Sequence, residues 1–213
     1  MDIPINILRQ YLRGVYFFCG TACGGKTTIS RAFAEKHDFL WLSEFELLAL
    51  MDQVAEPAYQ PAYCSGPMDW EVYFNRPYQE YARWMEDCAA EIVPLMILEL
   101  IKRCADRRVT VDLPFSVRTA LELAAPNHLV FLVTTPEIVV KEYFSRPSHR
   151  EILDEILRLK DPEKALANTN RTLEYMTRRV LDAVRQSGAP WIMRDEDSTV
   201  AGTLAQVERC FGF

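Results

Sequence analysis

Short apolar runs rich in β-branched and aromatic residues recur along the 213-residue chain, and longer stretches with helical spacing separate them. Five of these runs predict strands, at residues 15–19, 39–42, 109–113, 129–134 and 190–193. Strands that alternate with helices are typical of a parallel sheet with helices packed against it. The pattern therefore predicts an α/β fold, and the length suits a single domain spanning residues 1–213.

The run at 15–19 leads directly into a glycine-rich sequence, and a helical pattern with Ile29 and Phe33 on one face follows it. The sequence reads G-x-x-x-x-G-K-T, which is typical of a phosphate-binding P-loop between a strand and a helix. Backbone N–H groups can converge on phosphate oxygens where side chains are small, and the helix that follows points its positive end at the anion. We expect Lys26 to reach the β- and γ-phosphates of ATP and Thr27 to hold Mg²⁺. The residues expected to bind the nucleotide are Gly20, Thr21, Ala22, Cys23, Gly24, Gly25, Lys26, Thr27 and Thr28.

Composition and charge indicate which kind of molecule the protein binds. Thirty acidic residues against twenty-four basic ones give a formal charge of −6 without any block of Lys and Arg, which disfavours nucleic-acid binding and favours action on small molecules. The apolar run near the N-terminus is too short for a membrane span and has no small-residue cleavage site, so we expect neither membrane association nor a signal peptide. Cys23 lies in the P-loop, where the helix N-terminus would lower its pKa and make it redox-sensitive, although a small loop residue is the simpler explanation. The six cysteines form no C-x-x-C pair or zinc pattern and are expected to be reduced thiols of a cytoplasmic protein: Cys19, Cys23, Cys64, Cys88, Cys104 and Cys210.

The longest gap between predicted strands, residues 43–108, predicts a helical insertion. Ser43 is placed to cap its first helix, and Glu46 completes a capping box. A turn-rich segment at 56–69 then interrupts the helical pattern with Pro57, Pro61, Gly66 and Pro67. Helical spacing resumes after it, and the run 95–101, which is apolar on all sides, predicts a buried helix.

A carboxylate ends the third predicted strand, where Asp112 follows the apolar run 109–111. At the carboxyl end of a parallel strand, Asp112 lies beside the P-loop if the first and third strands are neighbours. There it would hold a Mg²⁺-bound water and share the metal site with Thr27. The alternative is an aspartate that only caps the next helix or begins the turn at Pro114.

Basic residues follow the fourth predicted strand in a largely helical tract, 137–187, which is interrupted at Pro147 and Pro162. Phosphoryl transfer spreads negative charge over the phosphoryl oxygens, and arginines on a closing lid neutralise that charge and exclude water. We expect this catalytic role for Arg146 and Arg150. The alternative is a pair of surface arginines that form ion pairs with neighbouring carboxylates.

Aromatic residues and an arginine lie together in the predicted insertion, where a substrate is expected. Aromatic rings near an arginine can sandwich a planar ring while the arginine holds an anionic group, so Trp70 and Arg76 are candidate substrate residues. Tyrosines and tryptophans at helical spacing equally fit a packed core. The whole set comprises Tyr59, Tyr63, Trp70, Tyr73, Arg76, Tyr78 and Trp84.

The order of these parts resembles that of the small P-loop kinases, the superfamily of nucleoside-monophosphate and shikimate kinases. The shared parts are the P-loop after the first strand, Asp112 ending the third, an arginine-bearing helical segment after the fourth, and a fifth strand followed by a terminal helix. The resemblance implies a three-layer P-loop fold, in which helices flank a five-stranded parallel sheet in the order 2-3-1-4-5. It also implies a substrate-side helical region and a mobile lid, which in this chain would be the insertion 43–108 and a segment at about 145–165.

The resemblance extends to the binding residues of these kinases. It places acceptor-binding residues after the second strand, where Glu44 or Glu46 would orient or deprotonate an acceptor hydroxyl unless they only cap a helix. It places adenine contacts near Arg194 and Thr199. The motifs depart from both branches of the superfamily: the sequence Asp112-Leu113-Pro114-Phe115 stands where adenylate kinases have Asp-Gly-Phe-Pro-Arg, and Ser43-Glu44-Phe45-Glu46 replaces the Asp-x-Asp of shikimate kinases. The identity of the acceptor therefore stays open.

The sequence predicts an enzyme that uses MgATP to phosphorylate a small-molecule acceptor, such as a nucleotide, a nucleoside or another hydroxyl metabolite. The first alternative is a nucleotide-dependent switch or sensor that acts on a protein partner through the insertion, and the second is a simple NTPase. The guanine-reading Asn-Lys-x-Asp pattern of GTPases is absent from the sequence, which disfavours the switch.

Overall fold

The computed structural model describes residues 3–66 and 69–213 and places five parallel strands in one sheet. The strands are β1 (Val15–Gly20), β2 (Leu40–Ser43), β3 (Val109–Asp112), β4 (Leu129–Val133) and β5 (Trp191–Met193). Their order, β2-β3-β1-β4-β5, confirms the order that the resemblance to small P-loop kinases implies. β1 is central, and its pairing with β3 sets Phe18 beside Asp112, so the predicted neighbourhood of the first and third strands is correct.

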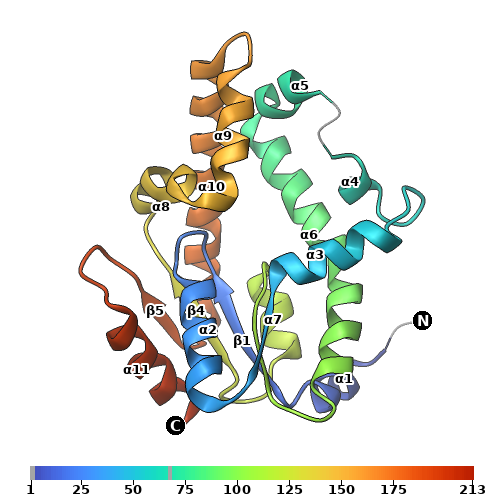
Figure 1. Cartoon of the computed structure of the whole chain (residues 1–213), viewed down its shortest axis with the longest axis vertical. Coiled ribbons are helices and arrows are strands. Elements are labelled where there is room, and N and C mark those ends of the chain that lie inside the picture. Colours follow the sequence, from blue (N-terminus) through green and yellow to red (C-terminus); the bar gives the residue numbers. More distant parts are fainter. Residues whose placement is uncertain (1–2, 67–68) are drawn as a thin grey trace.

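Alternation along β1 assigns the two faces of the sheet, because successive side chains of a strand point to opposite sides. Val15, Phe17 and Cys19 belong to one core cluster, and Tyr16 and Phe18 belong to another. The Tyr16 face is covered by two helices, α2 (Lys26–His37) and α11 (Val200–Phe211). The opposite face is covered by α1 (Ile5–Tyr11), α3 (Glu44–Val54), α6 (Tyr78–Arg103), α7 (Val117–Leu123) and α10 (Pro162–Ser187). The three layers of the expected α/β fold are visible in Figure 1.

The segment between β2 and β3 is helical, as expected, and consists of α3, α4 (Pro61–Cys64), α5 (Trp70–Asn75) and α6. Ser43 caps α3, since its hydroxyl accepts a hydrogen bond from the Glu46 N–H at 3.3 Å. α6 is one continuous helix through Pro94. The expectation that residues 95–101 are buried on all sides is wrong, because this helix packs on the core along one face and Leu98 is 62% exposed. The predicted turn residue Pro67 lies outside the described residues.

The tract between β4 and β5 contains α8 (Pro136–Glu142), the 3₁₀ turns η1 (Tyr143–Ser145) and η2 (Pro147–His149), α9 (Arg150–Leu157) and α10. The expected breaks occur before both prolines: the backbone is extended at Arg146, and Asp161 caps α10 by accepting from the Lys164 N–H at 3.0 Å. In Figure 1, α9, the first part of α10 and α5 stand at the end of the molecule opposite α1 and α11. There they form a third core cluster, whose buried members are Phe74, Tyr81, Ile156 and Ala165.

Candidate active site

The P-loop joins β1 to α2 at the carboxyl edge of the sheet, and glycines determine its shape. Gly20 and Gly25 have positive φ angles of 128° and 90°, and Cys23 adopts a φ of 54° between them. Gly24 packs against the end of β4, where an added Cβ would lie 2.3 Å from the carbonyl oxygen of Leu132. The loop is therefore held close to β4 with little room for side chains, which is the geometry that leaves backbone N–H groups open to a phosphate.

Lys26 and Thr27 begin α2 at the mouth of this loop. The Lys26 Nζ donates to the carbonyl oxygen of Thr21 at 2.7 Å, and the Thr27 hydroxyl donates to Oδ2 of Asp112. Asp112 is buried at the end of β3, and its Oδ1 has no hydrogen-bond partner in the described part of the chain. A hydroxyl and a carboxylate with a free acceptor atom are oxygen donors of the kind that Mg²⁺ prefers, directly or through water. The two residues predicted to organise Mg²⁺ thus lie together, and their donor atoms fit that ion.

Burial perturbs the charged groups around Lys26. Desolvation lowers the pKa of the Lys26 ammonium, while Glu44 and Asp112 act to raise it. Desolvation also raises the pKa of the Glu44 and Asp112 carboxyl groups, while Lys26 acts to lower both. Glu44, the first residue of α3, is therefore within electrostatic reach of Lys26 and Asp112. All three groups carry a charge that burial disfavours in the ligand-free protein.

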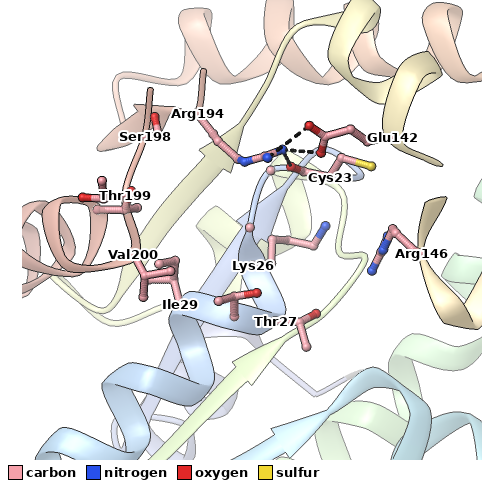
Figure 2. Close-up of a pocket in the computed structure, with 14 residues that line it drawn as sticks. Cys23, Lys26, Thr27, Ile29, Glu142, Arg146, Arg194, Ser198, Thr199 and Val200 are labelled. Atoms are coloured by element: carbon pink, nitrogen blue, oxygen red, sulfur yellow. Dashed lines mark hydrogen bonds and ion pairs between the residues drawn. The ribbon is translucent and has the colours of Figure 1, made fainter. Parts of the chain in front are cut away.

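A cavity of about 350 Å³ lies between the P-loop, the end of α8 and the start of α11 (Figure 2). Small-molecule sites typically occupy about 300–1,000 Å³, so the cavity is large enough for part of a nucleotide. Residues 23–28, the last six of the nine predicted to bind the nucleotide, all line it. Gly20, Thr21 and Ala22 precede them in the loop and do not line the cavity. The Thr21 hydroxyl instead fixes the loop to the sheet, because it accepts a hydrogen bond from the Thr134 N–H at 2.9 Å.

Arg194, directly after β5, bounds the cavity beside the P-loop. Its guanidinium pairs with both carboxylate oxygens of Glu142, at 2.7 and 3.2 Å, and donates to the carbonyl oxygen of Cys23 at 2.8 Å (Figure 2). Arg194 and Thr199, for which the resemblance implies adenine contacts, both line the cavity. Glu142 carried no signal in the sequence, because its partner follows 52 residues later and reaches it only through the pairing of β5 with β4.

The two predicted lid arginines occupy different positions. Arg146, the residue between η1 and η2, lines the cavity, and its charge lowers the pKa of Lys26. Figure 2 shows Lys26 between Arg146 and Arg194. Arg150 is exposed at the start of α9 and does not line the cavity. The structure therefore brings Arg146 to the P-loop but leaves Arg150 outside, so a role for Arg150 requires α9 to move.

Tyr143 connects this site to the helical insertion, and the sequence analysis gave it no role. Burial raises its pKa to about 12, and the other groups that influence it are Tyr73 on α5 and Arg146, Cys23 and Glu44 around the P-loop. Tyr143 is thus within electrostatic reach of residues on both sides, the P-loop and the insertion. In the sequence, its position three residues before Arg146 is what could have indicated a role for Tyr143.

The substrate candidates of the insertion lie in and around the third core cluster. Trp70 stacks on Phe74 with ring centroids 5.5 Å apart, which fits the alternative of a packed core residue. The Arg76 guanidinium lies over three aromatic rings, at 4.9 Å from the centroid of Tyr73, 5.3 Å from Trp84 and 6.0 Å from Tyr81. Arg76 forms no ion pair with a described residue, so its N–H donors stay available. Neither candidate lines the nucleotide cavity.

The remaining features to consider are the reactivity of the cysteines, a membrane span and a cluster of metal ligands. Burial raises the pKa of the Cys23 thiol, which is opposite to the lowering that a helix N-terminus would cause and argues against redox sensitivity. All six cysteines are free thiols. Across residues 3–66 and 69–213, no helix is long and apolar enough to cross a membrane, and no three His, Cys, Asp or Glu side chains gather as a metal site.

Comparisons with known proteins leave the activity open. No protein-family model and no curated protein sequence matches the chain. Among solved structures, shikimate kinase from Bacteroides thetaiotaomicron is 14% identical, with a TM-score of 0.48 over 92% of this chain and 94% of that one. Shikimate kinase from Acinetobacter baumannii, in complex with shikimate, is 16% identical, with a TM-score of 0.43 over 95% of this chain and 93% of that one. Likeness at this level carries no argument about activity.

Proposed function

We propose that this chain is a phosphotransferase that moves the γ-phosphoryl group of MgATP to a small-molecule acceptor. One observation carries the proposal: Arg146, from the tract between β4 and β5, lines the same cavity as the P-loop residues Lys26 and Thr27. Nucleotide binding alone needs only the P-loop and its metal residues. A further cation beside the phosphates supplies positive charge where negative charge develops as the phosphoryl group leaves.

Each part of the site has a task in this reaction. The N–H groups of the cavity-lining residues 23–28 bind the phosphates, and Lys26 exchanges its bond to the Thr21 carbonyl for the β- and γ-phosphate oxygens. Thr27 and Asp112 would hold Mg²⁺, which when bound would neutralise phosphate charge. Arg146 offsets the charge on the transferring phosphoryl group. Catalysis is then mainly positioning and electrostatic stabilisation.

The acceptor binds beside the insertion, between Glu44 at the start of α3 and Arg76 directly after α5. The carboxylate of Glu44, which burial makes more basic than an ordinary glutamate, orients an acceptor hydroxyl or accepts its proton. Arg76 follows α5, and its N–H donors suit an anionic group on the acceptor. A nucleotide or a hydroxy acid meets both requirements, and Trp70 contributes through its packing on Phe74 within the insertion.

Transfer also requires that water is kept from the γ-phosphate, since hydrolysis competes with it. The segment at about 145–165 enters the cavity through Arg146, and we assign it the task of covering the bound phosphates. Arg150 reaches the site only when this segment moves.

A nucleotide-dependent switch with a protein partner, or a simple NTPase, would use the same P-loop and the same metal residues. In transfer, Glu44 would accept the proton of the acceptor hydroxyl, whereas in an NTPase the same carboxylate would orient a water molecule. The distinction is chemical and can be measured directly.

The test follows the γ-phosphoryl group in a single turnover. The protein is incubated with Mg²⁺, γ-labelled ATP and a pool of nucleosides, nucleoside monophosphates and hydroxy acids, and the label is traced. We expect transfer to a member of the pool by wild type and none by Lys26→Ala. Label found only in inorganic phosphate would reduce the protein to an NTPase, and a failure to bind ATP would remove the P-loop interpretation.

A further inference from the structure

Residues of the tract between β4 and β5 and residues of the insertion pack into one core, although the two segments are far apart in the sequence. Ile156 of α9 and Phe74 of α5 are both fully buried, and Tyr81 and Ala165 complete the buried part of the third core cluster. Ile152, one turn before Ile156 on α9, packs against the same cluster. α9 therefore does not stand free above the nucleotide cavity, because its apolar face is already packed on the insertion (Figure 1).

Asn168 and Glu71 also join the two segments, because their side chains form hydrogen bonds with backbone groups. The Asn168 Nδ2 on α10 donates to the carbonyl oxygens of Phe74 at 2.9 Å and Arg76 at 2.7 Å, at the end of α5. The Glu71 Oε1 on α5 accepts from the Lys160 N–H at 2.7 Å, in the turn between α9 and α10. Carbonyl groups at a helix end have no partner within the helix, so the end of α5 is completed by a donor from α10.

Arg146 and Arg76 lie at the two ends of this connection. Arg146 lines the nucleotide cavity and leads through η2 into α9, whereas Arg76 directly follows α5. If Arg146 moves toward bound phosphates, α9 either separates from α5, which exposes Ile156 and Phe74 to water, or carries α5 with it. Exposure of buried apolar surface is unfavourable, and packed interfaces do not deform continuously. Joint movement is therefore the favoured course.

We propose that residues 70–85 and 150–168 move as one unit, the clamp unit, and that Asn168 is a positioning residue that makes Arg76 follow nucleotide binding at Arg146. The inference rests on the proposed function, because that function gives the two arginines their ligands. Its consequence is that nucleotide binding prearranges the acceptor side, and an anionic acceptor tightens nucleotide binding by the same factor. A lid that closes independently of the insertion has neither property.

Hydrogen exchange in the ligand-free protein tests the clamp unit without any nucleotide. Asn168→Asp keeps the size of the side chain but turns a carboxylate toward two carbonyl oxygens. We expect exchange in α5 to become several-fold faster, and exchange in α9, to which Asn168 donates no hydrogen bond, to rise by the same factor while β1 is unchanged. Glu174→Gln, at an exposed position of α10, is the matched control and should change none of these segments.

A second variant keeps this test valid if Asn168→Asp does not fold. Ile152→Val loosens the clamp unit from the α9 side, and we expect it to accelerate exchange in α5, which is remote in sequence. With either variant, acceleration confined to the helix that carries or contacts the substituted residue would overturn the proposal.

The same measurement with Mg²⁺ and β,γ-imido-ATP tests the coupling. In wild type we expect protection of residues 20–28, of α9 and also of α5, although no residue of α5 lines the nucleotide cavity. In Asn168→Asp the protection should persist in the first two segments and be lost in α5. Protection of the P-loop and α9 without α5 in wild type would overturn the inference and leave the proposed function standing. No protection of residues 20–28 would remove the proposed function, and the ligand-free result alone would then decide whether the clamp unit exists.

Discussion

Gly24→Ala tests the P-loop at the point where the structure leaves least room. An alanine Cβ would lie 2.3 Å from the carbonyl oxygen of Leu132, 2.9 Å from its carbonyl carbon and 3.2 Å from the carbonyl oxygen of Thr21. All three are backbone atoms, so no side chain can rotate away, and the loop or β4 must shift by roughly 1 Å to restore an ordinary contact. Overpacking costs about 1–3 kcal/mol, and with two backbone atoms so close we expect the upper end, about 3 kcal/mol of unfolding free energy.

Nucleotide binding gives this variant a second readout. A ligand at about 100 times its dissociation constant adds about 2.7 kcal/mol to the unfolding free energy, and in Gly24→Ala this increment should fall close to zero because the loop N–H groups no longer converge. Gly188 at the end of α10 provides the control, since its φ is 70° and an added Cβ there has nothing within 4 Å. Gly188→Ala should cost about 1 kcal/mol through backbone strain and keep the full increment.

Urea unfolding with and without Mg²⁺ and β,γ-imido-ATP measures both quantities. If Gly24→Ala unfolds like wild type and keeps the full nucleotide increment, the loop does not pack on β4 as described and the reasoning is refuted. If both glycine variants lose the increase in unfolding free energy that the nucleotide gives, the cause is general destabilisation and not the shape of the P-loop.

Four further substitutions examine the charged groups. Lys26→Ala should change the unfolding free energy by no more than about 1 kcal/mol and abolish most MgATP binding, which calorimetry checks; wild-type affinity in this variant would contradict the P-loop assignment. Asp112→Asn should keep nucleotide affinity within a modest factor and lower turnover by about 10- to 100-fold, with an altered Mg²⁺ dependence; an unchanged rate would leave Asp112 as a turn or cap residue. Arg146→Ala should lower turnover by about 100-fold or more with a smaller effect on ATP binding, as steady-state kinetics with an identified acceptor would measure. Arg150→Ala should have the weaker effect of the two, and the lid assignment fails if both variants are fully active.

The sheet and the P-loop could be predicted because local patterns define them. Each predicted strand agrees with the observed one to within one residue at either end, since β-branched and aromatic runs between helical stretches are short-range signals. The glycine positions and Lys26 are equally local, and so is the cap of α3 by Ser43. The strand order was implied by the resemblance, and the pairing of β1 with β3 that places Asp112 beside Thr27 agrees with it.

The remaining features depend on contacts between distant segments, for which a single sequence carries no pattern. Glu142 and Arg194 are ordinary surface residue types until β5 returns beside β4. Phe74 and Ile156 each lie on an amphipathic helix, but nothing local indicates that the two helices pack together. Tyr143 is one of nine tyrosines, and only its burial between the insertion and the P-loop distinguishes it. In the proposed clamp unit, the packing of Phe74 against Ile156 is what would couple the nucleotide side to the acceptor side.

Asp112 also connects the chemistry of the site to its stability. Burial raises its pKa above the ordinary value of 3.8, so between 3.8 and the raised pKa the folded chain binds more protons than the unfolded chain. Stability therefore falls as the pH rises through this window, and above the window the loss of stability is complete.

Asp112→Asn, which carries no charge, should unfold at a higher temperature than wild type at pH 7 without nucleotide, and the difference should vanish below pH 3.8. Thermal unfolding across this pH range measures it, with Asp197→Asn on the exposed surface as the control. A buried carboxylate that lowers stability is expected where function and not packing selects the residue, as the proposed Mg²⁺ role of Asp112 would require. If wild type proves at least as stable as Asp112→Asn at pH 7, the hydrogen bond from Thr27 outweighs desolvation and Asp112 serves the fold.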